Sequence, residues 1–232
     1  MSVEKHWQRV AIAACVAMCL SSSAISVSLA SNSQSPLARA LHDTNTVRTL
    51  QHYDVSTAVS GSVTVHSAIR GAEDEVRNRE RDSETVTITG PGPNGKFKKV
   101  HYTAEVIFVN GHTYYRTSLD HNTWHKHAGT TFVDRLSGIE FKRARTQLSF
   151  ASSVHFKLVG QPKGRARFRA TIPKSGATDD LLISTGRTPY VLGQTVRVPA
   201  KKGNKVHGVT RTTYGPFNKS LIILAPSSQG QA

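Results

Sequence analysis

Three arginines alternate with smaller or apolar residues in the stretch from Gly164 to Pro173, which reads G-R-A-R-F-R-A-T-I-P. Successive side chains of a β-strand point to opposite faces, so Arg165, Arg167 and Arg169 are predicted to share one face. Phe168 then belongs to the opposite face. A platform for single-stranded nucleic acid needs rings and cations on the same surface, so we expect no nucleic-acid partner. The arginines instead predict a basic surface that faces water or an anionic membrane.

Histidines form a second candidate group, with His121, His125 and His127 lying within seven positions. Imidazole is a common ligand for zinc and copper. Only Asp120 adds a carboxylate nearby, and no thiolate does, so the pattern favours a solvated rim over a metal site. Whether these histidines bind a metal stays open at this point.

The sequence offers little else that could carry catalysis. The adjacent acids Asp179 and Asp180 could form an acid–base or metal pair, but a loop followed by the start of a strand explains them more simply. There is no G-x-S-x-G, P-loop or H-E-x-x-H motif. We therefore predict a protein that is not an enzyme, with no catalytic residue, no metal and no cofactor.

The first thirty residues have the character of a signal peptide. A short basic start is followed by an apolar segment, and Ser28-Leu29-Ala30 suits a signal peptidase. Both cysteines, Cys15 and Cys19, lie inside this segment, so cleavage leaves no thiol. Ile12 to Cys15 also resembles a lipobox, which makes a lipidated Cys15 the alternative to cleavage after Ala30. Either reading predicts export to the cell envelope or beyond, with membrane anchoring as the second possibility.

Composition bounds the remainder of the chain. The 232 residues carry a formal net charge of +15. After a polar leader at 31–36, residues 37–228 suffice for one domain with a core of its own, followed by a polar tail at 229–232. Outside the cytoplasm the available polyanions include anionic lipid head groups, so attraction to a membrane surface is the expected meaning of the charge. We expect a monomer.

Hydrophobic periodicity predicts a mainly β domain. Helical spacing runs from Leu37 to about Leu50, and alternation then indicates one long strand from Tyr53 to Val65. Asn110-Gly111 specifies a two-residue hairpin turn that pairs Val109 with His112. In that register Glu105 faces Arg116 across the two strands.

Other segments are assigned in less detail. The highly charged segment 68–84 is predicted to be a loop or an exposed edge strand, and 131–150 a helix or a covering loop. Short runs bounded by turn residues predict an antiparallel arrangement of further strands. These strands are expected at 154–159, 166–172, 190–198, 206–212 and 220–224.

Several of these stretches together resemble the bacterial LolA and LppX/LprG-type lipoprotein carriers. The resemblance lies in the exported leader, the helix that runs into L-Q-H-Y-D-V-S-T-A-V-S-G-S-V, the hairpin V-N-G-H-T-Y-Y-R-T-S, the stretch F-K-L-V-G-Q-P-K-G-R-A-R-F-R-A-T-I-P and the ending T-T-Y-G-P-F-N-K-S-L-I-I-L-A-P. It covers most of the mature chain, as a pattern of spaced positions.

The resemblance implies a curved, incomplete antiparallel β-barrel (α+β), with helices that cover a concave apolar face. It also implies a non-catalytic carrier that binds lipid or acyl chains in a cavity. A sensing or protein-binding module of the cell envelope, with a protein partner, is the alternative. The apolar residues expected to line the cavity are Val55, Val59, Val63, Val86, Ile88, Tyr102, Val106, Phe108, Tyr115 and Phe168.

Overall fold

The structure is a computed structural model that describes residues 35–92, 95–129, 131–133, 140–142, 155–172, 175–200 and 206–227. The predicted signal peptide, Cys15 and most of segment 131–150 lie outside these residues. Within them the chain forms one α-helix, one short 3-10 helix and thirteen strands.

The first half of the chain contains α2 and the strands up to β6. Their bounds are α2 Pro36–Asn45, β1 Thr49–Ser60, β2 Val63–Asp74, β3 Arg79–Pro91, β4 Phe97–Val109, β5 His112–Thr117, the 3-10 helix η1 Ser118–Asp120 and β6 His125–Ala128. The second half contains β7 Thr131–Val133, β8 Glu140–Lys142, β9 Lys157–Gly160, β10 Arg165–Ile172, β11 Ala177–Ser184, β12 Val191–Val198 and β13 His207–Phe217.

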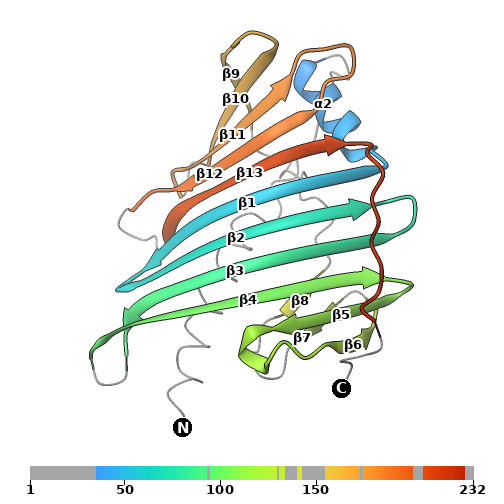
Figure 1. Ribbon diagram of the computed structural model, residues 1–232. Helices are drawn as coiled ribbons and strands as arrows, with labels where there is room; N and C mark the ends of the chain where they lie inside the picture. Colours follow the sequence, from blue (N-terminus) through green and yellow to red (C-terminus); the bar gives the residue numbers. More distant parts are fainter. Residues whose placement is uncertain are drawn as a thin grey trace.

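Eleven of these strands form one curved antiparallel sheet in the order β6-β5-β4-β3-β2-β1-β13-β12-β11-β10-β9 (Figure 1). Neighbours are joined by local hairpins or connections except at the centre, where β1 pairs with β13 and so unites the two halves of the chain. The edge strands β6 and β9 lie at opposite ends of this order, so the barrel is incomplete. The predicted fold class, a mainly β curved and open antiparallel sheet, is confirmed.

Helix α2 begins where the sequence places it but ends earlier. Ser35 caps its first turn by accepting from the amide of Ala38, and Pro36 occupies the first helical position. The helix stops at Asn45, and β1 has begun by Leu50, so the predicted helical end at Leu50 is wrong. Leu50 nevertheless packs in the same apolar cluster as the helix, which explains why the helical spacing continued through it.

The long strand predicted from Tyr53 to Val65 is instead a hairpin. Gly61 adopts a positive φ of 58° between β1 and β2, and Ser60 pairs with Val63. Because the turn interrupts the alternation, Val59 pairs with Thr64 while Val65 pairs with Ala58. Odd-numbered residues before and after the turn therefore point to opposite faces of the sheet.

The charged segment 68–84 is not a loop or an edge strand, because it forms most of β2 and the start of β3 in the interior of the sheet order. Its turn lies at 75–78, where Asn78 has a positive φ of 53°. Asp74 stabilises this turn by accepting from the backbone amide and the guanidinium of Arg77. Its charges are compatible with a sheet because each face collects charges of one predominant sign, as shown below.

The chain after β13 also departs from expectation. Residues 220–224 form no strand of the sheet. Ile223 is buried against Ile107, Val109 and Tyr114, and its carbonyl accepts from the guanidinium of Arg79. In Figure 1 this red segment runs across the ends of several strands towards β5 and β6.

Candidate functional site

The two faces of the eleven-stranded sheet differ in charge. Directly paired residues of adjacent strands share a face, so the registers assign each side chain to one of two surfaces. We call the surface that packs against α2 the α2 face, and the opposite surface the arginine face. Every arginine of these eleven strands lies on the arginine face: Arg70, Arg79, Arg81, Arg116, Arg165, Arg167, Arg169, Arg197 and Arg211. Carboxylates gather on the α2 face: Asp54, Glu73, Glu80, Asp82, Glu84 and Asp179.

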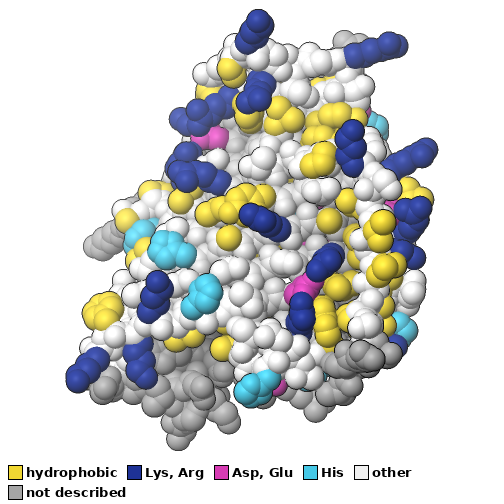
Figure 2. Space-filling model, viewed as in Figure 1, with side chains coloured by type: hydrophobic (Ala, Val, Ile, Leu, Met, Phe, Trp, Pro, Cys, Tyr) yellow, Lys and Arg dark blue, Asp and Glu magenta, His cyan; other side chains and the backbone are white. Residues whose placement is uncertain are grey.

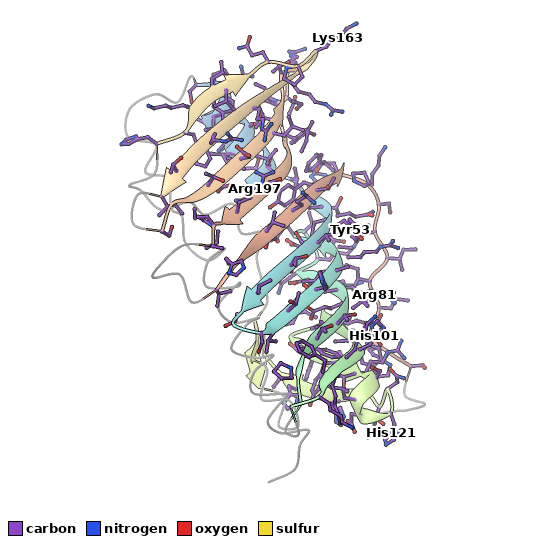
Figure 3. All side chains as sticks on the ribbon, turned by 90° about the vertical axis from the view of Figure 1, so that its left-hand side faces the viewer. Tyr53, Arg81, His101, His121, Lys163 and Arg197 are labelled. Atoms are coloured by element: carbon purple, nitrogen blue, oxygen red, sulfur yellow. The ribbon has the colours of Figure 1, made fainter. Side chains whose placement is uncertain are left out.

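Figure 2 looks onto the arginine face, where many Lys and Arg side chains and few carboxylates are visible. In the side view of Figure 3, Tyr53, Arg81 and His101 lie on this same side of the sheet. The predicted basic surface of Arg165, Arg167 and Arg169 is part of it, and Phe168 lies on the other face as expected.

Two carboxylates hold arginines on the arginine face. Asp180 accepts from Arg167 at 2.9 Å, from Arg169 at 2.5 Å and from Arg197 at 2.8 Å. Burial tends to raise the pKa of Asp180, but hydrogen bonds from these arginines outweigh it and lower the pKa to about 2. Glu105 binds the predicted partner Arg116 at 2.7 Å and also binds Arg81. The predicted hairpin register around Asn110-Gly111 is confirmed, because Val109 pairs with His112 and Glu105 with Arg116.

The registers divide the ten predicted cavity residues between the two faces. Eight share the α2 face: Val63, Val86, Ile88, Tyr102, Val106, Phe108, Tyr115 and Phe168. Val55 and Val59 lie on the arginine face, where Val55 pairs with Arg211 and is 39% exposed. The hairpin turn at Gly61 is the physical reason, because it makes odd-numbered residues before and after it point to opposite faces of the sheet. Their prediction as neighbours of the other eight is therefore wrong.

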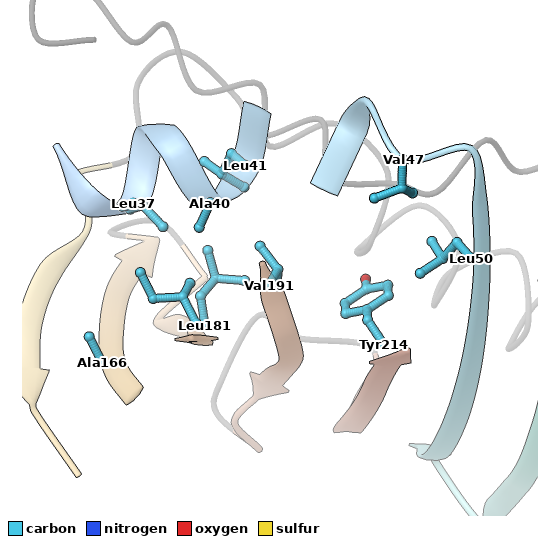
Figure 4. Close-up of a cluster of buried hydrophobic side chains, with 10 residues drawn as sticks. Leu37, Ala40, Leu41, Val47, Leu50, Ala166, Leu181, Val191 and Tyr214 are labelled. Carbon is cyan, nitrogen blue, oxygen red and sulfur yellow. The ribbon is translucent and has the colours of Figure 1, made fainter. Parts of the chain in front are cut away.

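The α2 face carries two apolar clusters. The first joins α2 to the sheet (Figure 4) and contains Leu37, Ala40, Leu41, Val47, Leu50, Ala166, Leu181, Ile183, Val191 and Tyr214, with Phe168 partly buried against it. The second lies over β2, β3 and β4 and contains Val65, Val86, Ile88 and Tyr102, with Val63 and Val100 partly buried against it. We call them the helix cluster and the valine cluster.

A diagonal row of polar side chains crosses the same face from β11 to β3. We call this row the polar band, and its members are Asp179, Gln194, Tyr214, His52, Asp54, Asp82 and Glu84. It lies beside residues of the helix cluster, and Tyr214 belongs to both. Asp54 and Glu84 are aligned through Ile69 of β2, and the alternation places Val86 next to Glu84 on this face. The band therefore continues into the valine cluster.

His52 occupies the centre of the polar band. Its Nδ1 lies 2.7 Å from Oδ2 of Asp54, and its Nε2 lies 3.6 Å from Oδ1 of Asp82, two strands away. Burial by itself would lower the pKa of His52, but the carboxylates of Asp54 and Asp82 outweigh it and raise the pKa to about 10. The imidazole is therefore a cation at neutral pH. Gly71 lies between the two, and a Cβ there would overlap the ring of His52 and the carboxylate of Asp82.

The other end of the band starts at Asp179, which is 0% exposed. Its Oδ2 accepts from the amide of Gln194 at 2.9 Å, and Oε1 of Gln194 accepts from the hydroxyl of Tyr214 at 3.3 Å. Oδ1 of Asp179 has no hydrogen-bond donor. Burial raises the pKa of Asp179 to about 7, and the nearby charge of Asp180 adds to the increase while Gln194 opposes it. This carboxyl is thus poised to exchange its proton near neutral pH.

Glu84, at the opposite end of the polar band, also has a raised pKa. Burial raises its pKa to about 7, with a further contribution from the charge of Asp82. For Tyr214, burial raises the pKa first, and the charges of Asp54 and Asp179 raise it further. Because both carboxylates act on the hydroxyl of Tyr214, the Asp179 end of the band and its centre are electrostatically connected.

Sequence reasoning missed the polar band. Asp179 was assigned to a loop before a strand, whereas it is the third residue of β11 and faces the core side. In each of the pairs His52/Asp54 and Asp82/Glu84, two polar residues are separated by one position, so both side chains lie on the same face of a strand. This spacing is the signal in the sequence that could have identified them as part of a polar site. Their meeting across β2 depends on the sheet register.

The predicted histidine group is only partly brought together. His125 and His127 share the α2 face of β6 and stack on Tyr115, and His125 binds Asp120. His121 lies outside the strand in a left-handed turn with φ 50°. Among the described residues no group of three or more His, Cys, Asp or Glu side chains could hold a metal ion. Across the same part of the chain, no helix is long and apolar enough to cross a membrane.

Comparisons with known proteins find likenesses in structure at very low sequence identity. The chain is similar to lipoprotein LppX of Mycobacterium tuberculosis, with a TM-score of 0.43, 8% identity and coverage of 81% of this chain and 96% of that chain. It is similar to a DUF1329 family protein from Desulfovibrio piger, with a TM-score of 0.32, 8% identity and coverage of 82% and 95%. A porin-like protein from Bacteroides uniformis gives a TM-score of 0.21, 6% identity and coverage of 74% and 97%. No protein-family profile matches the chain, and no curated protein sequence matches it.

Proposed function

We propose that the protein is an exported, non-catalytic carrier that holds lipid or acyl chains against the α2 face of its sheet. The observation that carries this proposal is the composition of one face, on which eight of the ten predicted apolar residues lie together with the helix and valine clusters. A polar band between apolar clusters complements a molecule that has both a head group and hydrocarbon chains. Burial of each CH₂ group would contribute about 0.8 kcal/mol to binding.

The export part of the proposal rests on residues 1–30, and the attraction to a membrane rests on the arginine face. A lipidated Cys15 would anchor the carrier, while cleavage after Ala30 would release it. The basic face would then bring the protein to anionic lipids, at about 1 kcal/mol for each cation near the surface.

The test is native mass spectrometry of protein isolated from its own membranes, followed by organic extraction and titration with a fluorescent fatty acid. We expect a bound lipid of defined mass and saturable uptake of the fatty acid. Val106→Ser, on the α2 face, should weaken uptake several-fold, whereas Val55→Ser, on the arginine face, should leave it unchanged. A protein that carries no lipid after gentle isolation and takes up no fatty acid would overturn the proposal.

A protein-binding or sensing module of the cell envelope is the second candidate, and one observation favours it. Ile222 and Leu224, in the segment that follows β13, are 81% and 64% exposed while Ile223 between them is buried. Exposed apolar side chains of this kind mark protein interfaces. If Ile222→Ser with Leu224→Ser abolishes association with a purified envelope partner while lipid content is unchanged, the module reading holds. If the protein carries lipid and this double substitution leaves its association with the partner unchanged, the carrier proposal is favoured instead.

A further inference from the structure

Three arginines of the arginine face gather around a single oxygen atom. Oδ2 of Asp180 accepts from Nη2 of Arg167 at 2.9 Å, from Nη2 of Arg169 at 2.9 Å and from Nη1 of Arg197 at 2.8 Å. Figure 3 shows Arg197 on the same side of the sheet as Tyr53. The arginines come from β10 and β12, on the two sides of β11, so their guanidinium groups meet at one point of the sheet. We call these three residues the arginine cluster.

The cluster has a surplus of positive charge that faces solvent. The side chain of Asp180 is 4% exposed, whereas those of Arg167, Arg169 and Arg197 are 44%, 43% and 43% exposed. Three positive charges therefore surround one buried negative charge. No other carboxylate of the described residues pairs with these arginines. One arginine would neutralise Asp180, so a structural ion pair does not account for the other two.

Most hydrogen-bond donors of the cluster remain available to a ligand. A guanidinium group carries five N–H donors. Within the described part of the chain, Asp180 takes one bond from Arg167, one from Arg197 and two from Arg169. The hydroxyl of Thr195, which is paired with Asp180 from β12, adds a donor on the same face. The cluster can therefore bond a ligand that has several acceptor oxygens.

We propose that the arginine cluster binds the phosphomonoester head group of a membrane lipid. A phosphomonoester carries a charge of about −1.5 to −2 at pH 7 and three terminal oxygens, which match the surplus charge and the remaining donors. Planar guanidinium groups bind such oxygens in pairs. A phosphodiester carries a single charge and two terminal oxygens, so it matches the cluster less well.

The surroundings of the cluster favour a lipid over a soluble phosphate. Arg165 and Arg211 lie on the same face, and neither has a carboxylate partner among the described residues. Tyr53 and Val55, on β1 of this face, are exposed. Tyrosine is favoured at the boundary between lipid head groups and acyl chains. A membrane surface can contact all of these side chains together, whereas a small soluble anion can contact only the cluster.

This inference rests on one part of the proposed function, the attraction of the arginine face to anionic lipids, and adds a preference among those lipids. Vesicle flotation at about 0.15 M salt tests it, because distant charges are largely screened there. Phosphatidic acid supplies the phosphomonoester and phosphatidylglycerol the phosphodiester, each in phosphatidylcholine vesicles adjusted to equal zeta potential. We expect phosphatidic acid to be bound about tenfold more tightly, the gain from one additional hydrogen bond between charged groups.

Substitutions at Arg197 test the cluster itself. Arg197→Gln should remove most of the preference for phosphatidic acid, and Asp180 keeps two arginine partners in this variant. Arg197→Lys keeps the charge but not the planar fork, so it should lose the preference while phosphatidylglycerol binding is retained. Arg167→Gln supplies the same test if the Arg197 variants do not fold.

Arg70→Gln is the matched control. Arg70 lies on β2 of the same face and contacts the ring of Tyr53 at 5.4 Å, away from the cluster. Its substitution removes the same charge, so it should weaken binding of both lipids equally. Uptake of fatty acid on the α2 face should stay unchanged in all these variants, so a failure of the carrier is detected separately.

The outcomes separate the cluster from the general attraction. Equal affinities for the two lipids, or the same loss of preference in the Arg197 and Arg70 variants, would overturn the cluster site and leave the membrane attraction intact. Binding of neither lipid would overturn both. Millimolar glycerol 3-phosphate should not displace the protein from phosphatidic acid vesicles. Complete displacement would overturn the assignment to a lipid, because the site would then take a soluble phosphomonoester.

Discussion

At the scale of single residues, Gly71 decides whether His52 can reach Asp82. The three lie in one row across β1, β2 and β3, and the absent side chain of Gly71 leaves room for the imidazole to extend over it. After Asp54, Asp82 is the second carboxylate that raises the pKa of His52, and its contribution requires this approach. A glycine within an interior strand weakens it, so a requirement for close approach explains its presence.

Gly71→Ala should displace His52 from Asp82 because the new Cβ would overlap both groups. We expect a loss of about 1–3 kcal/mol in the free energy of unfolding. NMR titration should show the pKa of His52 falling from about 10 towards its ordinary 6.5. Gly160→Ala, where a Cβ meets nothing within 4 Å, is the control and should change neither quantity. An unaltered His52 pKa in the Gly71 variant would contradict the role given to this glycine.

Asp179 should make stability depend on pH. Its pKa is raised from 3.8 to about 7 in the folded protein, so the folded state binds the proton more tightly than the unfolded state does. Ionisation of Asp179 therefore lowers the free energy of unfolding. The contribution is fully present below about pH 3.8 and is lost as the pH rises towards 7. At about 1.4 kcal/mol per pKa unit this amounts to roughly 4 kcal/mol. Glu84 adds a loss over the same range.

Asp179→Asn replaces the titrating group by a permanently neutral one. Urea unfolding at pH 4 and pH 7 should therefore show a smaller fall in the free energy of unfolding than in the original protein, with the remainder due to Glu84. Asp180→Asn removes a nearby charge that adds to the raised pKa of Asp179, so it should reduce this fall as well, but by less than Asp179→Asn does. The same slope in the Asp179 variant and the original protein would refute this assignment.

At the scale of elements, α2 is attached to the sheet by one buried hydroxyl as well as by apolar contacts. Oγ1 of Thr44 donates to the carbonyl of Ala40 at 2.6 Å and accepts from the amide of Val191 at 2.8 Å. The first bond lies within the helix and the second joins it to β12. The hydroxyl therefore satisfies a backbone amide at the start of β12.

Thr44→Val keeps the volume of the side chain but leaves the amide of Val191 without its acceptor. We expect the free energy of unfolding to fall by about 1–3 kcal/mol, as measured by urea denaturation. Thr46→Val is the control, because its hydroxyl bonds only to carbonyls at the exposed end of the helix. Equal losses in the two variants would show that the link to β12 contributes nothing of its own.

At the scale of the whole molecule, the sheet separates charge between its faces. Arginines occupy one surface, and most carboxylates of the strands occupy the other. This separation gives a protein of net charge +15 a basic surface on one side of the sheet and a face rich in carboxylates on the other. It also predicts that orientation at a membrane depends on the arginine face.

Binding to vesicles measures this orientation. We expect the protein to bind phosphatidylglycerol vesicles and not phosphatidylcholine vesicles, with an affinity that falls as salt is added. Lys157 pairs with Arg169 on the arginine face, whereas Lys98 pairs with Gly90 on the other. Lys157→Gln should weaken binding about fivefold, corresponding to roughly 1 kcal/mol, and Lys98→Gln should weaken it less. Equal effects of the two changes would mean that net charge alone governs the attraction.

Patterns within short stretches of the sequence were enough to predict the features whose physical causes lie within a few residues. Alternation placed Arg165, Arg167 and Arg169 opposite Phe168, and Asn110-Gly111 specified a hairpin in which Glu105 meets Arg116. A two-residue turn and a period of two are properties of a few neighbouring residues, so these assignments are confirmed. The mainly β, antiparallel class followed from the same regularities.

Which faces of the strands match, and which distant residues come together, depends on strand pairing, and the sequence patterns did not predict it. The turn at Gly61 reversed the alternation and moved Val55 and Val59 away from the other predicted apolar residues. The register of the eleven-stranded sheet brings His52 to Asp82 across β2. The same register links Asp179 through Gln194 to Tyr214, although these residues are distant in the sequence. Such contacts arise from pairing between strands, and no short stretch of sequence contains the information that sets their register.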